Sequence, residues 1–413
     1  MKVSKKEFNQ IYDLEPYRKE ARVRVLSCEK INDEDRRHWP SLTPQAAYKL
    51  VLDKTVFYPE GGGQLGDMGQ LGDAQVLDTR WGYGDFSESI FHLTDKALDI
   101  ESDLKAELDW DRRFDFMQQH SAEHILSGIC HKHYGYDNVG FHLGVDNTTL
   151  DFDGPLTWEQ VRALIGAANR VIWPDRPIKV KVFDEDPSKG EGISYRSKIE
   201  LKGKVRLIQI DDADLCACAA PHLSSTGQIG LILVTKLENW KKGVRLHLLA
   251  GQRAYTYVQE SQKILDDLSN LFSLPILSIP EGIAKQEERL AQSQDRIYQG
   301  QNFLWADLLN EGIDQVFYLD NPLFDSDFAK RQIKAYEPEE TGHRLLILIP
   351  VNQGLSFYLA ESSPSWIKIL RETFGAKGGG PPQFSQGFIG AKDLNADTLA
   401  QAIKDRLLAE CVK

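Results

Sequence analysis

The spacing of apolar residues changes along this chain, and each change predicts a different kind of secondary structure. Residues 1–95 alternate apolar and polar side chains in short runs, which are broken by the glycine-rich stretch PEGGGQLGDMGQLGD. Alternation indicates strands with one buried face, and glycines permit the turns between them. We therefore predict a small β-barrel over residues 1–95.

From about Asp111 the apolar residues recur at helical spacing, and this helix should end at the sequence HYGYDN. A second helix is expected from Thr157, an N-cap candidate with Gln160 three residues later, to about Ile172. Strand-like runs then return, namely IKVKVFD, VRLIQI, IGLILVTKLEN and VRLHLLAG. Residues 96–250 are predicted to form an α/β domain around a helix pair.

Two long helical segments follow Gly251 and are joined by the proline-containing sequence SLPILSIP, which predicts a helical hairpin over residues 251–310. A long coiled coil is not expected, because polar residues occupy half of its seam positions. Residues 311–413 mix strand-like runs with helical stretches around the motif GAKGGGPPQFSQGFIG, which predicts a small C-terminal α/β domain. The expected fold class is α+β.

Composition narrows the class of protein. A chain of 413 residues exceeds what one hydrophobic core usually serves. It has no apolar stretch long enough for a membrane helix, and its first residues lack the apolar centre of a signal peptide, so we expect no membrane partner and a cytoplasmic location. Five scattered cysteines are too few for a disulfide framework, and we expect reduced thiols.

The net charge of −12 argues against a protein that coats nucleic acid through a broad basic surface. Basic residues nevertheless gather in YRSKIELKGKVR and in KKGVRLH. On charge alone we favour a solvated strand edge that resists aggregation, and a local nucleic-acid site is the alternative.

His120 and His124 lie four positions apart in QQHSAEHIL, inside the first predicted helix. Residues with this spacing share one helix face and are roughly 5 to 6 Å apart, so two imidazoles can bind one metal ion. The spacing alone is weak support, because histidines on helices are often surface or capping residues.

A second pair of candidate ligands strengthens the metal interpretation. Cys218 and His222, in DLCACAAPHLSSTGQIG, have a short ligand-pair spacing and lie between two predicted strands. One thiolate and three imidazoles suit tetrahedral zinc. Cys216 is a competing thiol, although we favour Cys218. Four protein ligands would make a closed site and three ligands plus water a reactive one, and the residues alone leave both open.

Three ordered motifs resemble a known family. KTVFYPEGGGQLGDMG, WDRRFDFMQQHSAEHIL and CAAPHLSSTGQIG are similar to the editing domain of alanyl-tRNA synthetases and to the free-standing AlaX proteins. The last hundred residues resemble the C-terminal domain of those synthetases, with AKGGGPPQFSQG at its glycine motif. The resemblance covers nearly the whole chain. It implies a deacylase that hydrolyses tRNA(Ala) mischarged with serine, and sometimes glycine, and it leaves no room for an aminoacylation domain.

The resemblance also implies roles for individual residues. It implies that the zinc ligands are His120, His124, Cys218 and His222. Its glycine-rich turn falls on Gly61, Gly62 and Gly63, and we take Gly62, Gly63 and the following Gln64 as catalytic candidates. Thr55 matches the threonine that is associated with recognition of the serine side chain. The candidate tRNA contacts are Arg112, Arg113, Lys241, Lys242, Gly378, Gly379 and Gly380.

Ester hydrolysis requires a positioned water and stabilisation of an oxyanion. Four protein ligands leave little room for a bound hydroxide, so we favour a zinc ion that positions the substrate over one that activates water. Glycines such as Gly62 and Gly63 allow the backbone to approach the ester closely, although they would also suit an ordinary hairpin turn. A hydroxyl such as that of Thr55 would favour serine over alanine.

One departure from the family pattern bears on specificity. This chain has Ala219, Ala220 and Pro221 where the family usually has Gly-Gly-Thr, and proline removes an N–H donor. This departure and the acidic balance leave a non-catalytic, zinc-stabilised protein that binds tRNA or a synthetase as one alternative. The editing domain of threonyl-tRNA synthetases has a similar His and Cys pattern, so editing of another seryl-mischarged tRNA such as tRNA(Thr) is the other. The C-terminal glycine motif would contact the outer part of the tRNA, pack the domain or mediate a homodimer, and the sequence leaves these open.

Overall fold

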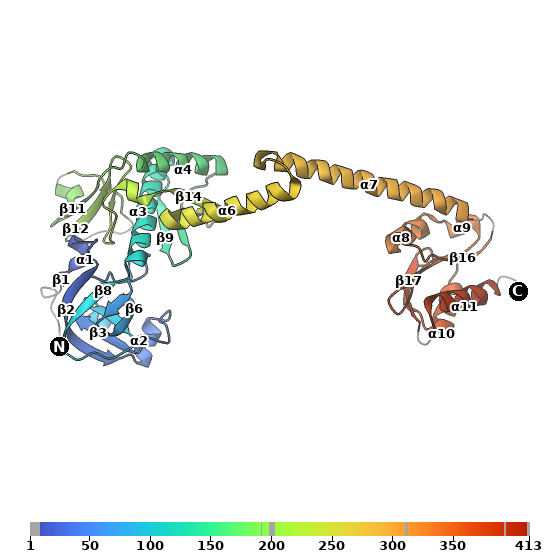
Figure 1. Ribbon diagram of the computed structural model, residues 1–413, viewed down its shortest axis with the longest axis horizontal. Helices are drawn as coiled ribbons and strands as arrows, with labels where there is room; N and C mark the ends of the chain where they lie inside the picture. The colour runs from blue at the N-terminus through green and yellow to red at the C-terminus, as the bar shows by residue number, and fades with distance from the viewer. Residues whose placement is uncertain (1–8, 191, 198–202, 310–312, 392–393, 411–413) are drawn as a thin grey trace. The chain divides into compact units, whose positions relative to one another are not determined.

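The computed structural model describes residues 9–190, 192–197, 203–309, 313–391 and 394–410. The chain divides into two compact units, Met1–Asp266 and Asp267–Lys413. Figure 1 shows the order of the elements within each unit. In the described part of the chain, no helix is both long and apolar enough to cross a membrane. The mixture of a closed barrel, open sheets and helices confirms the predicted α+β class.

The first unit begins with a closed six-stranded barrel in the order β2-β3-β7-β6-β5-β8. Its strands are β2 (Glu20–Lys30), β3 (Tyr48–Leu52), β5 (Gly69–Leu71), β6 (Ala74–Trp81), β7 (Ile90–Thr94) and β8 (Asp103–Leu108). Alternate residues of β2 face the barrel core, as the apolar and polar alternation predicted. The strand β8 lies beyond residue 95, yet it closes the barrel because it pairs with both β2 and β5.

Short elements surround the glycine-rich turn and the barrel. The strand β1 (Asn9–Gln10) pairs in parallel with β4 (Lys54–Thr55), and α1 (Ile11–Leu14) follows β1 directly. The helix α2 (Asp33–His38) and the 3-10 turn η1 (Gly84–Phe86) lie in barrel connections. The turn after β4 has left-handed backbone at Gly62 and Gly63, with φ of 61° and 86°, a conformation that favours glycine.

A 25-residue helix, α3 (Trp110–Tyr134), follows the barrel. The side chain of Asp109 caps its N-terminus, and Gly135 ends it with φ of 70° in the HYGYDN sequence. The second predicted helix is α4 (Trp158–Ile172), and its predicted capping box between Thr157 and Gln160 is present. The two helices contact each other, which confirms the helix pair.

Two antiparallel sheets accompany this helix pair. One has the order β14-β15-β10-β9 and comprises β9 (Asn138–Leu143), β10 (Thr148–Phe152), β14 (Ile232–Trp240) and β15 (Gly243–Ala250). The other has the order β11-β12-β13 and comprises β11 (Ile178–Phe183), β12 (Val205–Ile210) and β13 (Asp214–Ala217). The short α5 (Pro187–Gly190) and η2 (Thr226–Ile229) lie in connections.

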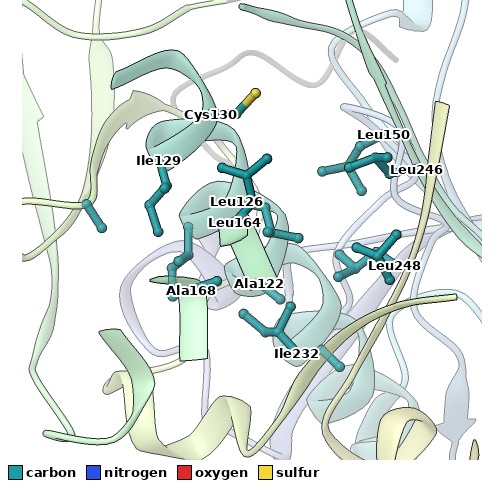
Figure 2. Close-up of a cluster of buried hydrophobic side chains, with 14 of the residues drawn as sticks. Ala122, Leu126, Ile129, Cys130, Leu150, Leu164, Ala168, Ile232, Leu246 and Leu248 are labelled. Carbon is teal, nitrogen blue, oxygen red and sulfur yellow. The ribbon is translucent and has the colours of Figure 1, made fainter. Parts of the chain in front are cut away.

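The core of this region lies between α3, α4 and the four-stranded sheet (Figure 2). Ala122, Leu126 and Ile129 face it from α3, and Leu164 faces it from α4. These side chains are almost completely buried, and burying one leucine-sized side chain contributes roughly 1.5 to 3 kcal/mol. The apolar face therefore anchors α3 and determines the direction of its remaining residues.

Two long helices follow, α6 (Gly251–Phe272) and α7 (Ile279–Leu308), with the 3-10 turn η3 (Ile276–Ser278) between them. Proline at the second position of α7 suits the start of a helix, where no intrahelical partner is lost. Most of the described part of the segment is thus helical, and the antiparallel pairing of the two helices stays a prediction.

The second unit carries a five-stranded sheet in the order β16-β17-β18-β20-β19. Its strands are β16 (Gln315–Tyr318), β17 (Leu345–Val351), β18 (Gly354–Ala360), β19 (Lys377–Gly379) and β20 (Ser385–Gly390). Its helices are α8 (Ser326–Ala335), α9 (Pro338–Thr341), α10 (Trp366–Phe374) and α11 (Ala396–Leu408). Apolar cores lie on both faces of β17 and β18, since successive residues of a strand face opposite sides.

Candidate metal centre

The helix α3 places His120 and His124 on one face, with ring centroids 5.3 Å apart. Both side chains are almost completely buried, with 3% and 2% of their surface exposed. Buried imidazoles require polar partners, because an unpaired polar group inside a protein costs free energy. The partners come from β13, from the loop that follows it and from the glycine-rich turn.

The second pair of ligands follows β13 in the sequence. The Arg206 guanidinium holds this loop in place, because its Nη1 donates to the carbonyls of Cys218 at 2.8 Å and of Ala220 at 3.0 Å. Gly128 allows α3 to approach β13, since a Cβ there would lie 2.2 Å from the carbonyl oxygen of Ala213. The loop and the helix therefore meet closely.

The four predicted ligands converge in the structure. The Cys218 Sγ lies 3.6 Å from the His120 Nε2 and 3.4 Å from the His222 Nε2. One potential ligand atom from each of His120, His124, Cys218 and His222 lies within 4.8 Å of the others. Tetrahedral zinc, with its usual bond lengths to sulfur and nitrogen, separates these two atom types by about 3.5 Å. The donor set and its spacing fit this ion.

Each histidine turns its other ring nitrogen toward a polar side chain. The three Nδ1 atoms lie 2.8 Å from Gln64 Oε1 for His120, 3.0 Å from Asp214 Oδ2 for His124, and 3.1 Å from Ser121 Oγ for His222. Partners of this kind orient the ring and leave Nε2 to face the centre, as in protein metal sites. Asp214 is itself held by Arg196, at 2.7 and 3.0 Å.

The protonation states in the cluster depend on burial and on neighbouring charges. Burial raises the pKa of the Cys218 thiol, but His120 and His222 outweigh it and hold this pKa well below its usual value. Burial and the neighbouring His124 lower the pKa of His222 to about 3. Burial lowers the pKa of His124, but its hydrogen bond to Asp214 prevails and raises it well above its usual value. A thiolate and a neutral imidazole suit metal binding, whereas a proton competes with a cation at His124.

The competing thiol lies in a different group. Cys216 lies with His124 and Asp214, and these three also place ligand atoms within 4.8 Å of one another. Burial raises the pKa of the Cys216 thiol to about 11, which opposes the thiolate form that binds metals. The geometry thus joins Cys218, rather than Cys216, to the three histidines.

A cavity of about 410 Å³ adjoins this cluster. Its wall includes His120, His124 and Cys218, and also Gly62 from the glycine-rich turn. Cavities of this size hold small organic groups. The cavity therefore joins the glycine turn of the barrel to the metal cluster.

Three residues of the glycine-rich turn have different places in the site. Gly62 lines the cavity, and a Cβ there would meet no atom within 4 Å. Gly63 packs against β9, where a Cβ would lie 2.3 Å from the carbonyl oxygen of Phe141. Gln64 is fully buried and contacts His120, so the structure places it behind a predicted ligand.

Thr55 is the last residue of β4 and is fully buried. Its Oγ1 lies 2.7 Å from the His92 Nε2 and accepts a hydrogen bond from the Phe57 N–H at 3.0 Å. The residues that line the cavity do not include Thr55. The structure therefore does not bring this predicted substrate-binding residue to the metal cluster.

The residues predicted to contact tRNA differ in how far they are exposed. Arg113 is fully buried, forms an ion pair with Asp67 and donates to the carbonyls of Pro16 and Val56, so its guanidinium has no surface for tRNA. Arg112 is half-buried and donates to the Gly66 carbonyl at 3.1 Å. The remaining candidates are exposed or half-buried, and they comprise Lys241 and Lys242 in the β14–β15 turn and Gly378, Gly379 and Gly380 at β19. Lys198 and Lys202 of the predicted basic run lie outside the described residues.

Sequence reasoning missed the residues that orient the ligands. Asp214 has a readable signal, because Asp214 and Cys216 alternate along β13 and should share a face, and Cys218 continues this spacing just beyond the strand. Ser121 and Arg206 have no such signal, since Ser121 contacts a residue 101 positions away and Arg206 binds backbone carbonyls, which any residue carries.

Comparisons with known proteins agree with these observations. The family described as the threonyl and alanyl tRNA synthetase second additional domain matches residues 205–246, a segment that contains Cys218 and His222. The alanyl-tRNA editing protein AlaX-L of Pyrococcus horikoshii is 26% identical over 407 residues, which cover 92% of this chain and 95% of that protein.

Two other relatives match in part. The alanyl-tRNA editing protein Aarsd1-B of Xenopus laevis is 30% identical over 62% of this chain and 61% of its own length. An alanine–tRNA ligase of Pyrobaculum aerophilum is 30% identical over 87% of this chain, which spans 41% of that ligase. The likeness to the ligase thus extends over most of this chain.

Proposed function

We propose that the chain is an alanyl-tRNA editing protein like the AlaX-type relatives that it resembles, and that it hydrolyses the ester between a wrong amino acid and tRNA(Ala). The proposed substrates are chiefly Ser-tRNA(Ala) and also Gly-tRNA(Ala). Because aminoacyl-tRNA is the substrate in this proposal, we place the protein in the cytoplasm.

One observation carries the proposal. Four potential ligand atoms from α3 and the loop after β13 converge within 4.8 Å, beside a cavity whose wall includes Gly62. In this proposal His120, His124, Cys218 and His222 would hold zinc, and the ion would supply a positive charge that positions the substrate. Four protein ligands favour this role over a zinc-bound hydroxide.

The chain's own residues complete the site in this proposal. Gly62 carries no side chain, so the ester can approach the backbone of the glycine-rich turn. Arg206 and Lys204 lie on the cavity wall and provide positive charge for the phosphate next to the terminal ribose. The cavity binds the aminoacyl end, and its limited volume restricts the size of the amino acid.

Serine preference would require a polar partner in the cavity. In this structure the Thr55 hydroxyl is hydrogen-bonded to His92. If Thr55 binds the serine hydroxyl, it must give up this hydrogen bond and form one with the substrate instead. Replacing Thr55 by valine would then reduce the preference for seryl over alanyl ester. An unchanged preference would remove Thr55 from the proposal.

A second candidate substrate is tRNA(Thr) mischarged with serine. The matching domain family takes its description from threonyl as well as alanyl synthetases, and Pro221 departs from the expected alanyl pattern. A non-catalytic, zinc-stabilised tRNA-binding protein is the remaining alternative. Each alternative predicts a different result in the same assay.

The test is deacylation of a panel of tRNAs by the purified full chain, with and without a chelator. The panel comprises Ser-tRNA(Ala), Gly-tRNA(Ala), Ala-tRNA(Ala) and Ser-tRNA(Thr). We expect the seryl ester of tRNA(Ala) to be hydrolysed about tenfold faster than the alanyl ester, or more. Alanine has no hydroxyl, so a buried polar group of the site would stay unpaired when it binds, at a cost of about 1 to 3 kcal/mol. Equal rates for serine and alanine, or tight binding without turnover, would overturn the proposal.

A further inference from the structure

A buried carboxylate lies beside the metal cluster and takes no part in the four-ligand set. Glu123 immediately precedes His124 on α3, is only 3% exposed and lines the cavity. Its Oε1 accepts hydrogen bonds from the Ser127 hydroxyl at 2.7 Å and from the Asn138 amide. Its Oε2 lies 3.7 Å from the His124 Nε2, the ring nitrogen opposite the one that contacts Asp214.

This arrangement fixes the carboxylate firmly. Ser127 lies one turn further along α3, and Asn138 begins β9, so donors from two elements hold Oε1. Burying a carboxylate is costly unless charges or donors compensate it. The donors to Oε1 position the carboxylate, and its Oε2 faces His124 on the same helix.

The charges on the cavity wall are segregated. Glu123 is buried, whereas Lys204 is exposed and Arg206 is half-buried. An aminoacyl ester of tRNA has the same order of charges, because its ammonium group is attached to the carbon next to the carbonyl and its first phosphate lies beyond the ribose. The ammonium would enter first, toward Glu123, and the phosphate would stay near the two basic residues.

We propose that Glu123 binds the α-ammonium group of the aminoacyl ester and thereby places the ester carbonyl beside the metal cluster. This inference rests on the proposed function and goes further, because it makes a free α-amino group a requirement of the site. Esters whose amine is acylated, such as peptidyl-tRNA, lack the positive charge and are poor substrates. The site would thus spare the growing peptide chain.

The test compares two esters of tRNA(Ala). One carries serine, and the other carries 3-hydroxypropionate, which keeps the serine hydroxyl but has a hydrogen atom in place of the ammonium. Each kcat/KM is divided by the rate of spontaneous hydrolysis of the same ester, which corrects for intrinsic reactivity. The full-length wild-type protein should prefer the seryl ester by about 10- to 100-fold, the range expected for a hydrogen bond between charged groups.

The Glu123→Gln variant keeps the size of the side chain and an oxygen for Ser127 and Asn138, but it removes the charge. The preference for the seryl ester should fall to within about threefold of unity, as in a double-mutant cycle that isolates one contact. Ser127→Ala is the matched control, because it removes one donor and leaves the carboxylate, so the preference should persist. Zinc content should be unchanged in both variants.

Failure of the inference is distinguishable from failure of the proposed function. If the wild-type protein hydrolyses neither ester, the proposed function is wrong. If it hydrolyses both equally after correction, Glu123 does not bind the ammonium, and this result requires no variant. An equal loss on both esters in Glu123→Gln, or a loss of zinc, would assign Glu123 a structural or metal-binding role and overturn the inference.

Discussion

The side-chain carbonyl of Gln64 lies 2.8 Å from Nδ1 of His120, and this contact joins the barrel to the metal cluster. Gln64 is fully buried at the end of the glycine-rich turn, while His120 belongs to α3. A glutamine carbonyl in this position accepts the Nδ1 proton and leaves Nε2 directed at Cys218. The turn therefore orients a ligand as well as lining the cavity.

The two neighbouring cysteines should behave differently toward zinc. Cys218→Ala removes the only thiolate among the four converging ligands, so the variant should bind zinc at least about tenfold more weakly and lose deacylation with it. Cys216→Ala is the matched control and should keep both. Zinc per chain, measured by elemental analysis after dialysis, checks the prediction, and full zinc in Cys218→Ala would show that the ligand set is wrong.

Asp214 should support metal binding without contacting the metal. Asp214→Asn weakens the acceptor for His124 Nδ1, so zinc affinity should fall by about 10- to 100-fold. Asp137→Asn is the control, because Asp137 contacts the exposed His131 at 2.8 Å on the same helix. Competition with a chelating dye measures both affinities, and an equal effect of the two substitutions would contradict the prediction.

The two left-handed glycines of the turn should differ in their tolerance of alanine. Gly63→Ala should lower the free energy of unfolding by about 2 to 4 kcal/mol, because a Cβ would lie 2.3 Å from the Phe141 carbonyl oxygen in addition to the backbone strain. Gly62→Ala has open space and should cost only about 1 to 2 kcal/mol, the strain alone. Urea unfolding compares them, and similar losses would be inconsistent with this packing.

His92 should make the stability of the barrel depend on pH. Burial lowers the pKa of His92 to about 4, so between this value and the usual pKa near 6.5 the unfolded chain binds a proton that the folded chain does not. The contribution of His92 to the free energy of unfolding is therefore complete above pH 6.5 and is lost as the pH falls toward 4. Between pH 7 and pH 4.5 the wild type should lose about 2 kcal/mol more than His92→Gln. Parallel losses in urea unfolding would refute this assignment.

Local spacing was enough to predict much of the fold and the identity of the candidate ligands. The helical period of α3 and the capping box of α4 appear as predicted, because both depend on residues within a few positions of one another. The spacing of His120 and His124 determined that the two rings share a face. The change of period also marked where the barrel gives way to helices.

Only the tertiary structure decided how distant residues are paired. It placed β8 in the barrel, buried Arg113 against Asp67, paired Thr55 with His92 and grouped Cys218 with the three histidines. Helix and strand periods follow from backbone geometry over a few residues. Burial, charge pairing and the orientation of a ring instead depend on which surfaces pack together across about a hundred residues of chain. The sequence by itself therefore determined the kinds of ligand and their local spacing, and packing decided which side chains surround them.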